Sequence, residues 1–426
     1  MTRGFDLDRF REEAGAEAAA DIKLIPRIAL QAFCETPGVA KVIEAAAADR
    51  RMAKAHVKVH MGGLAAAAEF YGSAPTPNLI VVESKDAGRE MLGLLDRLAE
   101  VCDAGTKVVV IGHVNDVLLY RELMRRGVAE YMVAPFELFD FMRTVGEIFC
   151  APDRAPLGRT IAFIGARGGV GSSTIAHNVS WSISKMLEAD VVLADLDLAW
   201  GTAGLDFNQD PAQGIAEALS QPDRVDDVFL DRILAKCAEH LSLLAAPSTL
   251  ERAYDLDEAA VEPIMDTMRQ SVPTVVMDVP HQWTGWVRRT LRAADEVVIV
   301  ASPDLASLRN TKNLLDFLKQ SRPNDRAPHL VLSQVGVPKR PEIKAVDFAK
   351  ALEVEPVAVI PFEPALFGAA ANNGQMIAEI DPRSPIGEIF RTIGQVVTGR
   401  GEVRKQKKTA FGPLLAKLRR GQSKAG

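Results

Sequence analysis

Short apolar segments alternate with longer amphipathic segments along most of the chain. In its first third, five segments rich in β-branched residues predict strands: RIALQAF (27–33), HVKVHM (56–61), LIVVE (79–83), KVVVIGH (107–113) and EYMVA (130–134). The segments between them, such as 87–103 and 116–126, have helical periodicity. Strands that alternate with helices indicate a parallel sheet. We therefore expect a small doubly wound α/β domain over residues 25–149.

A second alternating series begins after a segment with two prolines and a glycine, which predicts a linker over 150–159. Seven further strands are expected: TIAFIGA (160–166), VVLADLD (191–197), LSLLAAP (241–247), TVVMDVP (274–280), EVVIVASP (296–303), HLVLSQV (329–335) and VAVIPF (357–362). The pattern predicts one larger three-layer α/β domain over 160–400, with a mainly parallel sheet.

The two ends of the chain do not follow this pattern. Residues 1–24 predict a flexible N-terminus, and residues 401–426 form a tail in which eight Lys or Arg accompany one Glu. The tail also carries Phe411 and three leucines. It could bind the anionic surface of an inner membrane, remain solvated, or dock on an acidic partner, and the sequence leaves these three readings open.

Composition excludes several classes of protein. The net charge of −6 argues against a general nucleic-acid binder, because neutralising phosphates needs a basic surface. The four cysteines show no metal-ligand spacing. Neither a run of 18 apolar residues nor an apolar leader is present. We expect a cytoplasmic protein, with the cell pole and the inner-membrane surface as candidate sites.

The segment GARGGVGSSTIAHN, residues 165–178, joins a predicted strand to a helix predicted over SSTIAHNVSWSISKML, residues 172–187. Glycines in such a turn let main-chain N–H groups approach an anion, and the helix N-terminus adds partial positive charge. A tight strand-to-helix turn without a ligand is the alternative. The residues expected to bind nucleotide here are Gly168, Gly169, Val170, Gly171, Ser172, Ser173 and Thr174, and the Ser173 hydroxyl is expected to bind Mg²⁺.

This loop departs from the strict pattern G-x-x-x-x-G-K-[ST], because Ala166 replaces the first glycine and Ser172 replaces the lysine. It resembles the deviant phosphate loop of the MinD/ParA ATPases. In that family an early lysine reaches across a nucleotide-sandwich dimer, and the resemblance gives this position to Arg167. Losing a charge-assisted hydrogen bond of about 1.5–3 kcal/mol weakens binding roughly ten- to hundredfold. It also removes a cation that stabilises phosphoryl transfer. We therefore expect a loop that holds ATP but hydrolyses it slowly or not at all.

Acidic residues follow the strands on which that family places them. The resemblance implies that Asp195 belongs to the nucleotide site, that Asp197 orients the attacking water, and that Asp278 holds Mg²⁺ through water. Carboxyl ends of parallel strands meet at one edge, where doubly wound folds bind ligands. Ser333 and Pro361 lie where the family cradles adenine. The cofactors so implied are ATP or ADP, with Mg²⁺. Taken singly, each acid could instead cap a helix or turn.

The first domain resembles a response-regulator receiver that lacks its chemistry. Glu83 occupies the position of the phosphoacceptor Asp, Gly112 that of the usual Thr or Ser, and Ala134 that of the usual Lys. Without an acid cluster there is no Mg²⁺ site, so we interpret the domain as a pseudo-receiver that serves interaction. A Rossmann-like domain unrelated to receivers would lack the same chemistry.

The combination of the two domains narrows the resemblance further. The strings HVKVHMGGLAAAAEFY, DLDLAWGTAGLDFN and IPFEPALFGAAANNGQMIAE are similar to the CpaE/TadZ pilus-assembly family. This resemblance implies a dimeric cytoplasmic factor, often polar, that positions the Flp (Tad) type IV pilus secretion machine. Its partners would be a second copy, components of that machine or polar hub proteins, and no specific nucleic acid. An active ATPase that cycles on and off the membrane and a ParA-type DNA partition protein are the rival hypotheses.

Overall fold

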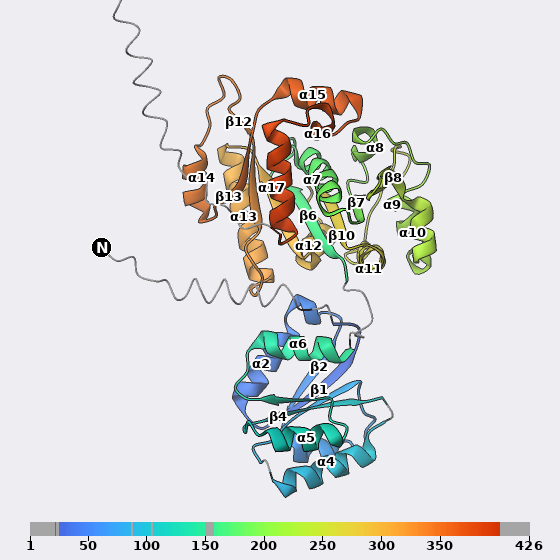
Figure 1. Ribbon diagram of the computed structural model, residues 1–426, viewed down its shortest axis with the longest axis vertical. Coiled ribbons are helices and arrows are strands. Elements are labelled where there is room, and N and C mark those ends of the chain that lie inside the picture. The colour runs from blue at the N-terminus through green and yellow to red at the C-terminus, as the bar shows by residue number, and fades with distance from the viewer. Residues whose placement is uncertain (1–21, 23–24, 87, 104, 150–156, 401–426) are drawn as a thin grey trace, which may run out of the picture.

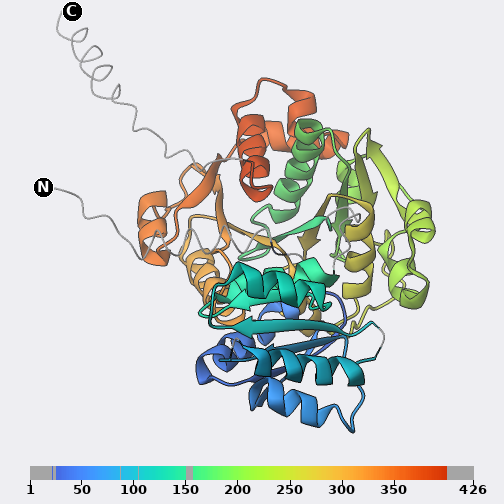
Figure 2. The same cartoon turned by 60° about the horizontal axis from the view of Figure 1, so that its bottom comes forward.

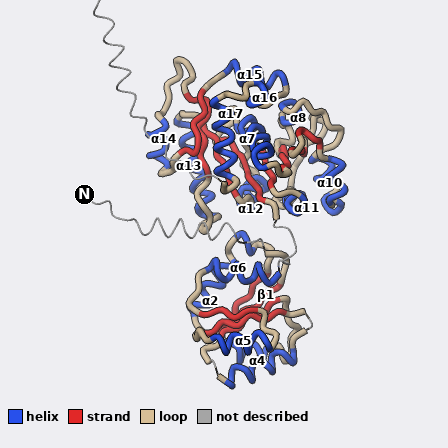
Figure 3. The backbone as a smooth tube through the Cα atoms, viewed as in Figure 1, coloured by secondary structure: helices blue, strands red, loops and turns tan. Residues whose placement is uncertain are grey.

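The structure is a computed structural model, and it describes residues 22, 25–86, 88–103, 105–149 and 157–400. Two sheets, each covered by helices on both faces, make up an N-terminal domain (β1 to α6) and a C-terminal domain (β6 to α17) (Figures 1 and 3). The predicted basic tail lies outside the described residues, as do most of the predicted linker and flexible N-terminus. The predicted domain boundaries stay predictions.

The N-terminal sheet has five parallel strands in the order β2-β1-β3-β4-β5. Its strands are β1 (Ala29–Cys34), β2 (His56–Met61), β3 (Leu79–Glu83), β4 (Lys107–Gly112) and β5 (Glu130–Val133). Its helices are α2 (Pro37–Ala47), the short η1 (Arg50–Met52), α3 (Gly63–Phe70), α4 (Arg89–Val101), α5 (Val117–Arg125) and α6 (Leu138–Phe149). Helices α2 and α6 bury apolar side chains on one face, and α3, α4 and α5 on the other. This is the expected doubly wound arrangement.

The C-terminal sheet has eight strands in the order β13-β12-β11-β6-β10-β7-β9-β8. They are β6 (Arg159–Gly165), β7 (Val191–Asp195), β8 (Ala235–Ala238), β9 (Leu241–Leu244), β10 (Thr274–Val279), β11 (Glu296–Ala301), β12 (His329–Val335) and β13 (Pro356–Pro361). Seven were expected. The additional β8 pairs antiparallel with β9 at the edge. Its four residues, AKCA, are too short and too weakly apolar to show a strand pattern in the sequence.

Helices cover both faces of this sheet. They are α7 (Ser172–Leu187), α8 (Ala203–Asp206), α9 (Ile215–Ser220), η2 (Pro222–Arg224), α10 (Asp227–Ile233), α11 (Glu262–Ser271), α12 (Gly285–Ala293), α13 (Leu305–Ser321), α14 (Ala345–Leu352), α15 (Pro364–Asn373), α16 (Ile377–Ile380) and α17 (Pro385–Val397). Within the described part of the chain, none of them combines the length and apolar character that crossing a membrane requires.

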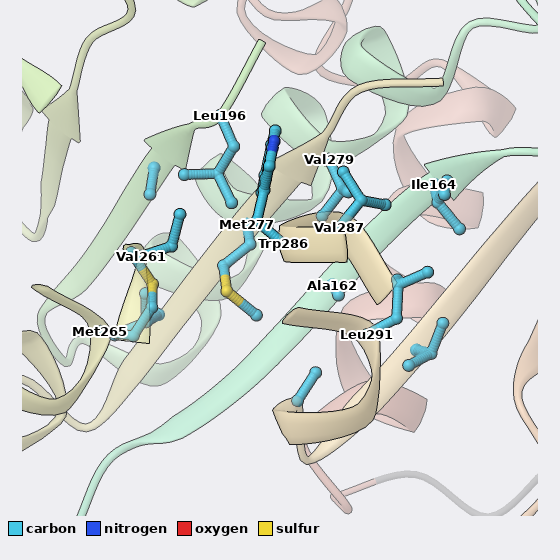
Figure 4. Close-up of a cluster of buried hydrophobic side chains, with 14 of the residues drawn as sticks. Ala162, Ile164, Leu196, Val261, Met265, Met277, Val279, Trp286, Val287 and Leu291 are labelled. Carbon is cyan, nitrogen blue, oxygen red and sulfur yellow. The ribbon is translucent and has the colours of Figure 1, made fainter. Parts of the chain in front are cut away.

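Two apolar cores fix the sheet between its helices. On one face α11, α12 and α13 pack against the strands, with Met265, Trp286 and Leu291 in the cluster of Figure 4. On the other face α7 and α17 pack together over the central strands. All six residues of β10 are buried, as expected for a parallel strand covered on both sides. The fold class predicted from the sequence is confirmed.

Candidate functional site

The loop between β6 and α7 lies at the carboxyl edge of the central strands. Helix α7 begins at Ser172, where the sequence predicted it. Gly169 and Gly171 have φ angles of 79° and 84°, which only glycine adopts without strain. Gly168 is exposed, and a Cβ placed on it would meet no atom within 4 Å. The loop therefore has the open, glycine-dependent shape that close approach of an anion requires.

Three side chains from other elements hold the carbonyl groups of this loop. His281 Nδ1 donates to Gly165 O (2.9 Å), Asn310 Nδ2 to Ala166 O (2.8 Å) and Gln334 Nε2 to Gly169 O (2.7 Å). Among the hydrogen bonds of the described residues, none uses the main-chain N–H groups of Gly168, Gly169, Val170 or Gly171. The carbonyls are thus fixed, and the donors remain available for an anion. Neither His281 nor Asn310 was predicted from the sequence to belong to the site.

The first turn of α7 supplies hydroxyl groups beside these donors. Ser172 Oγ is buried and has no hydrogen-bond partner among the described residues. Ser173 and Thr174 are half-buried. A buried hydroxyl without a partner costs free energy unless a ligand or water binds it. The geometry therefore fits a phosphate group, although Ser172 brings no positive charge to it.

Arg167 does not extend freely from the loop. Its guanidinium Nη1 lies 3.2 Å from Asp304 Oδ2, and its side chain is 50% exposed. Asp304 is the N-cap of α13, where its other carboxylate oxygen accepts a hydrogen bond from Ser307 N (2.8 Å). The cation expected to act across a dimer is thus paired within its own chain in this structure.

The three predicted acids lie together at the carboxyl ends of β7 and β10. Register places Asp278 beside Asp195 in the sheet. Asp195 is buried, and its two oxygens accept hydrogen bonds from the N–H groups of Asp197 and Ala203 (both 3.1 Å). Burial and the charge of Asp278 raise the pKa of Asp195 to about 7. Asp195 therefore shapes the turn that follows β7 in this arrangement.

Asp197 is less enclosed than Asp195. Its carboxylate accepts a hydrogen bond from Trp200 N (3.1 Å), and burial raises its pKa. Within the described residues, no three side chains of His, Cys, Asp or Glu are gathered as ligands for a metal ion. A Mg²⁺ ion here would need ligands from the hydroxyl of Ser173, from water and from phosphate oxygens.

A buried histidine joins this acidic group. His177 is fully buried, with Nδ1 2.7 Å from Asp206 Oδ2 and Nε2 3.5 Å from Asp278 Oδ2. Burial would lower the pKa of His177, but the two carboxylates outweigh it and raise the pKa to about 10. A cation thus lies beneath the site, where the sequence analysis identified none. Residues 172–184 contain no Asp, Glu, Lys or Arg, which is typical of a helix buried on all sides. This signal predicts that a histidine within the segment is buried and paired.

The residues expected around adenine lie at the ends of β12 and β13. Ser333 is buried, and its Oγ would lie 3.7 Å from a Cβ built on Gly171. Pro361 is exposed and pairs in register with Val335. Both residues are therefore at the same edge as the loop, and their contact with a base stays a prediction.

The degenerate receiver site is closed by hydrogen bonds within the protein. Glu83 is buried, and its carboxylate accepts from Glu35 N (2.7 Å), Thr36 N (2.9 Å), Thr36 Oγ1 (2.7 Å) and His113 Nε2 (3.0 Å). Burial would raise the pKa of Glu83, but these donors outweigh it and lower the pKa. Thr36 is also the N-cap of α2. The carboxylate therefore occupies the anion position at the start of that helix.

Two further positions of this site differ from a working receiver. A Cβ placed on Gly112 would lie 2.1 Å from the hydroxyl oxygen of Tyr131, whose O–H donates to Val114 O (2.8 Å). The aromatic ring thus fills the space that a Thr or Ser side chain at 112 would need. Ala134 follows β5 and carries no charge. The pseudo-receiver interpretation of Glu83, Gly112 and Ala134 stays a prediction.

Comparisons with known proteins match the N-terminal and C-terminal domains separately. A family model described as an AAA domain matches residues 158–329. The septum site-determining protein MinD of Bacillus subtilis is 22% identical over 257 residues, which cover 57% of this chain and 90% of that protein. The crystal structure of a ParA family ATPase from Chlorobium tepidum superimposes with a TM-score of 0.51 at 22% identity, covering 56% of this chain and 98% of that chain. These likenesses show the fold of the C-terminal domain.

The N-terminal region has a much nearer relative. The crystal structure of a pilus assembly protein CpaE from Caulobacter crescentus is 53% identical, covering 30% of this chain and 97% of that chain, with a TM-score of 0.29. The sequence identity, rather than the TM-score, makes this comparison informative.

Proposed function

The chain belongs to the CpaE family of pilus assembly proteins, and from this premise we propose that it is a localisation and assembly factor for a Flp (Tad) pilus secretion machine. It acts as a dimeric MinD-like scaffold that binds ATP or ADP with Mg²⁺ and hydrolyses ATP weakly or not at all. The observation that carries the nucleotide proposal is the loop at 165–172. Its carbonyls are held by His281, Asn310 and Gln334, and its glycine N–H groups are available.

Named residues would hold each part of the nucleotide. The N–H groups from Gly168 to Ser172 and the N-terminus of α7 would bind phosphate. The Ser173 hydroxyl would hold Mg²⁺ directly and Asp278 would hold it through water; the ion neutralises phosphate charge when bound. Asp197 would orient water, and Ser333 with Pro361 would flank the base.

Slow hydrolysis follows from the charges of the loop. Ser172 supplies a hydroxyl where a cation would stabilise charge that develops during phosphoryl transfer. Arg167 is engaged by Asp304 at 3.2 Å and would have to leave it to reach a phosphate. The scaffold proposal is therefore preferred over an active ATPase that cycles on the membrane.

Dimerisation is supported by apolar side chains at the same edge of the sheet. Trp200 is 69% exposed, Leu205 73%, Trp283 53% and Leu305 73%. These four side chains follow β7, β10 and β11, the strands whose ends surround the loop. A second copy of the chain placed over the loop would cover them and bring its Arg167 to the shared nucleotide. Pilus-machine components or polar hub proteins would then bind the N-terminal domain.

A charge placed in the loop tests the nucleotide proposal. Gly168→Glu puts a carboxylate where phosphate would bind, whereas Gly168→Ala adds only a Cβ to the same open position. Calorimetry with Mg²⁺ and a slowly hydrolysed ATP analogue should give binding for the wild type and Gly168→Ala, and none for Gly168→Glu. Ser172→Lys should tighten binding roughly ten- to hundredfold. No heat with the wild-type chain at millimolar nucleotide would refute the proposal.

The mass of the protein with ATP, with ADP and without nucleotide tests the scaffold. A dimer in all three conditions supports it, and a dimer only with ATP supports a nucleotide switch. A hydrolysis rate that falls in Asp197→Ala would favour the ATPase hypothesis, and binding to non-specific DNA at moderate salt would favour the partition protein.

A further inference from the structure

Charged side chains join the two domains at the turn that follows α2. Arg50 Nε and Arg51 Nη2 each lie 2.6 Å from a carboxylate oxygen of Asp325, which follows α13. Asn324 Nδ2 donates to Asp49 Oδ2 (2.9 Å). We call these five residues the ionic joint. The side chains of Arg51 and Asp325 are only 5% and 6% exposed. Removing Asp325 would deprive these buried arginine side chains of a carboxylate partner, so the joint resists partial rearrangement.

The ionic joint also reaches the start of β6, the strand that leads into the loop. Arg50 Nη1 lies 3.4 Å from Asp295 Oδ1 and donates to Ala293 O (3.2 Å). The second oxygen of Asp295 accepts from Thr160 N (2.9 Å) and Thr160 Oγ1 (3.0 Å). Thr160 is the second residue of β6, which ends at Gly165.

Helix α13 connects the ionic joint to the loop more directly. At its C-terminal end, Arg322 Nε lies 2.6 Å from Asp325 Oδ2. At its N-terminal end, Asp304 pairs with Arg167, and Asn310 Nδ2 donates to Ala166 O. The 17 residues of the helix span about 25 Å. Figures 1 and 2 show its C-terminal end facing the N-terminal domain. One rigid element therefore contacts the loop at one end and the other domain at its other end.

We propose that α13 couples the phosphate loop to the N-terminal domain. Nucleotide binding draws Arg167 away from Asp304, the helix shifts as a unit, and the fit of Asp325 to Arg50 and Arg51 changes. The surface that the N-terminal domain offers to partners therefore differs between the nucleotide-free and the nucleotide-bound protein. This inference rests on the proposed nucleotide binding. Coupling free energy is reciprocal, so a partner that binds the N-terminal domain in one nucleotide state must alter nucleotide affinity by the same factor, and breaking the ionic joint should change that affinity.

The affinity of the full-length chain for the ATP analogue with Mg²⁺ tests the coupling. Arg50→Gln, which breaks the ionic joint far from the loop, should change the Kd by about fivefold or more. Arg125→Gln is the matched control, because Arg125 forms an ion pair with Glu122 on α5 and is 76% exposed. Its Kd should equal that of the wild type.

A double-mutant cycle identifies the route of the coupling. Asp304→Ser keeps an oxygen to cap α13 but removes the partner of Arg167. In this background Arg50→Gln should change the Kd by a smaller factor, because the helix keeps only its Asn310 contact with the loop. An equal effect of Arg50→Gln on the Kd in both backgrounds would refute a route through the Arg167–Asp304 pair.

Circular dichroism first verifies that each variant folds. If Arg50→Gln does not fold, Asn324→Asp is used in its place. The new carboxylate at the half-buried position 324 faces Asp49 and disturbs the ionic joint. If the wild type binds nucleotide and the folded joint variant has the same Kd within twofold, the coupling is refuted and the nucleotide proposal stands. If the wild type binds no nucleotide, both are refuted.

Discussion

Glu83 illustrates how a single buried carboxylate can hold several elements of a domain together. Its carboxylate carries the same kind of charge as a phosphoacceptor aspartate, but it is one methylene longer and reaches the N-terminus of α2. There it accepts hydrogen bonds from the Glu35 and Thr36 N–H groups, from the Thr36 hydroxyl and from His113. Glu83 is thus part of the framework that holds β1, β3 and β4 together.

Glu83→Ala should destabilise the N-terminal domain by about 3 kcal/mol, because several donors lose their acceptor in a buried site. All four tryptophans lie in the C-terminal domain, so their fluorescence reports that domain alone. In urea unfolding followed by circular dichroism, a transition should appear at a lower urea concentration than in the wild type. The midpoint followed by tryptophan fluorescence should shift less. Glu100→Ala, at an exposed position of α4, is the control. Equal stability of the two variants would contradict this role of Glu83.

At the scale of elements, α7 is held to its neighbours by charge as well as by apolar packing. His177 contacts Asp206 on α8 and Asp278 on β10 from inside the fold. Asp195 accepts a hydrogen bond from Ala203 N that fixes the start of α8. The position of α8, which carries the exposed Leu205, therefore depends on buried charged groups below the candidate nucleotide site.

His177→Ala should destabilise the C-terminal domain by roughly 3–5 kcal/mol, since it leaves buried carboxylates without their cation. The tryptophan-detected urea midpoint measures this loss. His240→Ala is a suitable control, because His240 pairs with Asp190 at a half-exposed position. A loss below about 1 kcal/mol, the value typical of an exposed pair, would show that the buried carboxylates are neutral without His177.

At the scale of the whole molecule, the two domains meet through charges rather than through a shared apolar core. Arg50 and Arg51 contribute from one domain, and Asp325 and Asp295 from the other. Burial would raise the pKa of Asp325, but Arg50, Arg322 and Arg51 outweigh it and lower the pKa to about 2. The contact is therefore fully charged at neutral pH.

The pH dependence of this contact follows from the lowered pKa. A carboxyl group with a folded-state pKa of about 2 stabilises the fold above its unfolded value of about 3.9. That contribution, about 2–3 kcal/mol, is lost as the pH falls from about 4 to 2. Urea unfolding of the wild type and Asp325→Asn should differ by this amount at pH 6 and converge near pH 2. A difference independent of pH would contradict the argument.

The sequence predicted the alternating strands and helices and the fold class, because strands buried on both faces are continuous apolar runs such as TVVMDV. It also placed the glycine loop and the start of α7 at Ser172, because glycine and hydroxyl spacing is local information. It missed β8, whose four residues are paired only at the sheet edge.

The tertiary structure alone decided which charges meet. Arg167 lies 137 residues from Asp304, and Arg50 lies 275 residues from Asp325. His177 acquires its carboxylates only when α7 packs on β10 and α8. Helices and strands can be predicted from the sequence because each depends on residues that are close to one another along the chain. The partner of a buried charge is set by packing between distant segments, since only there does exclusion of water make an unpaired charge costly.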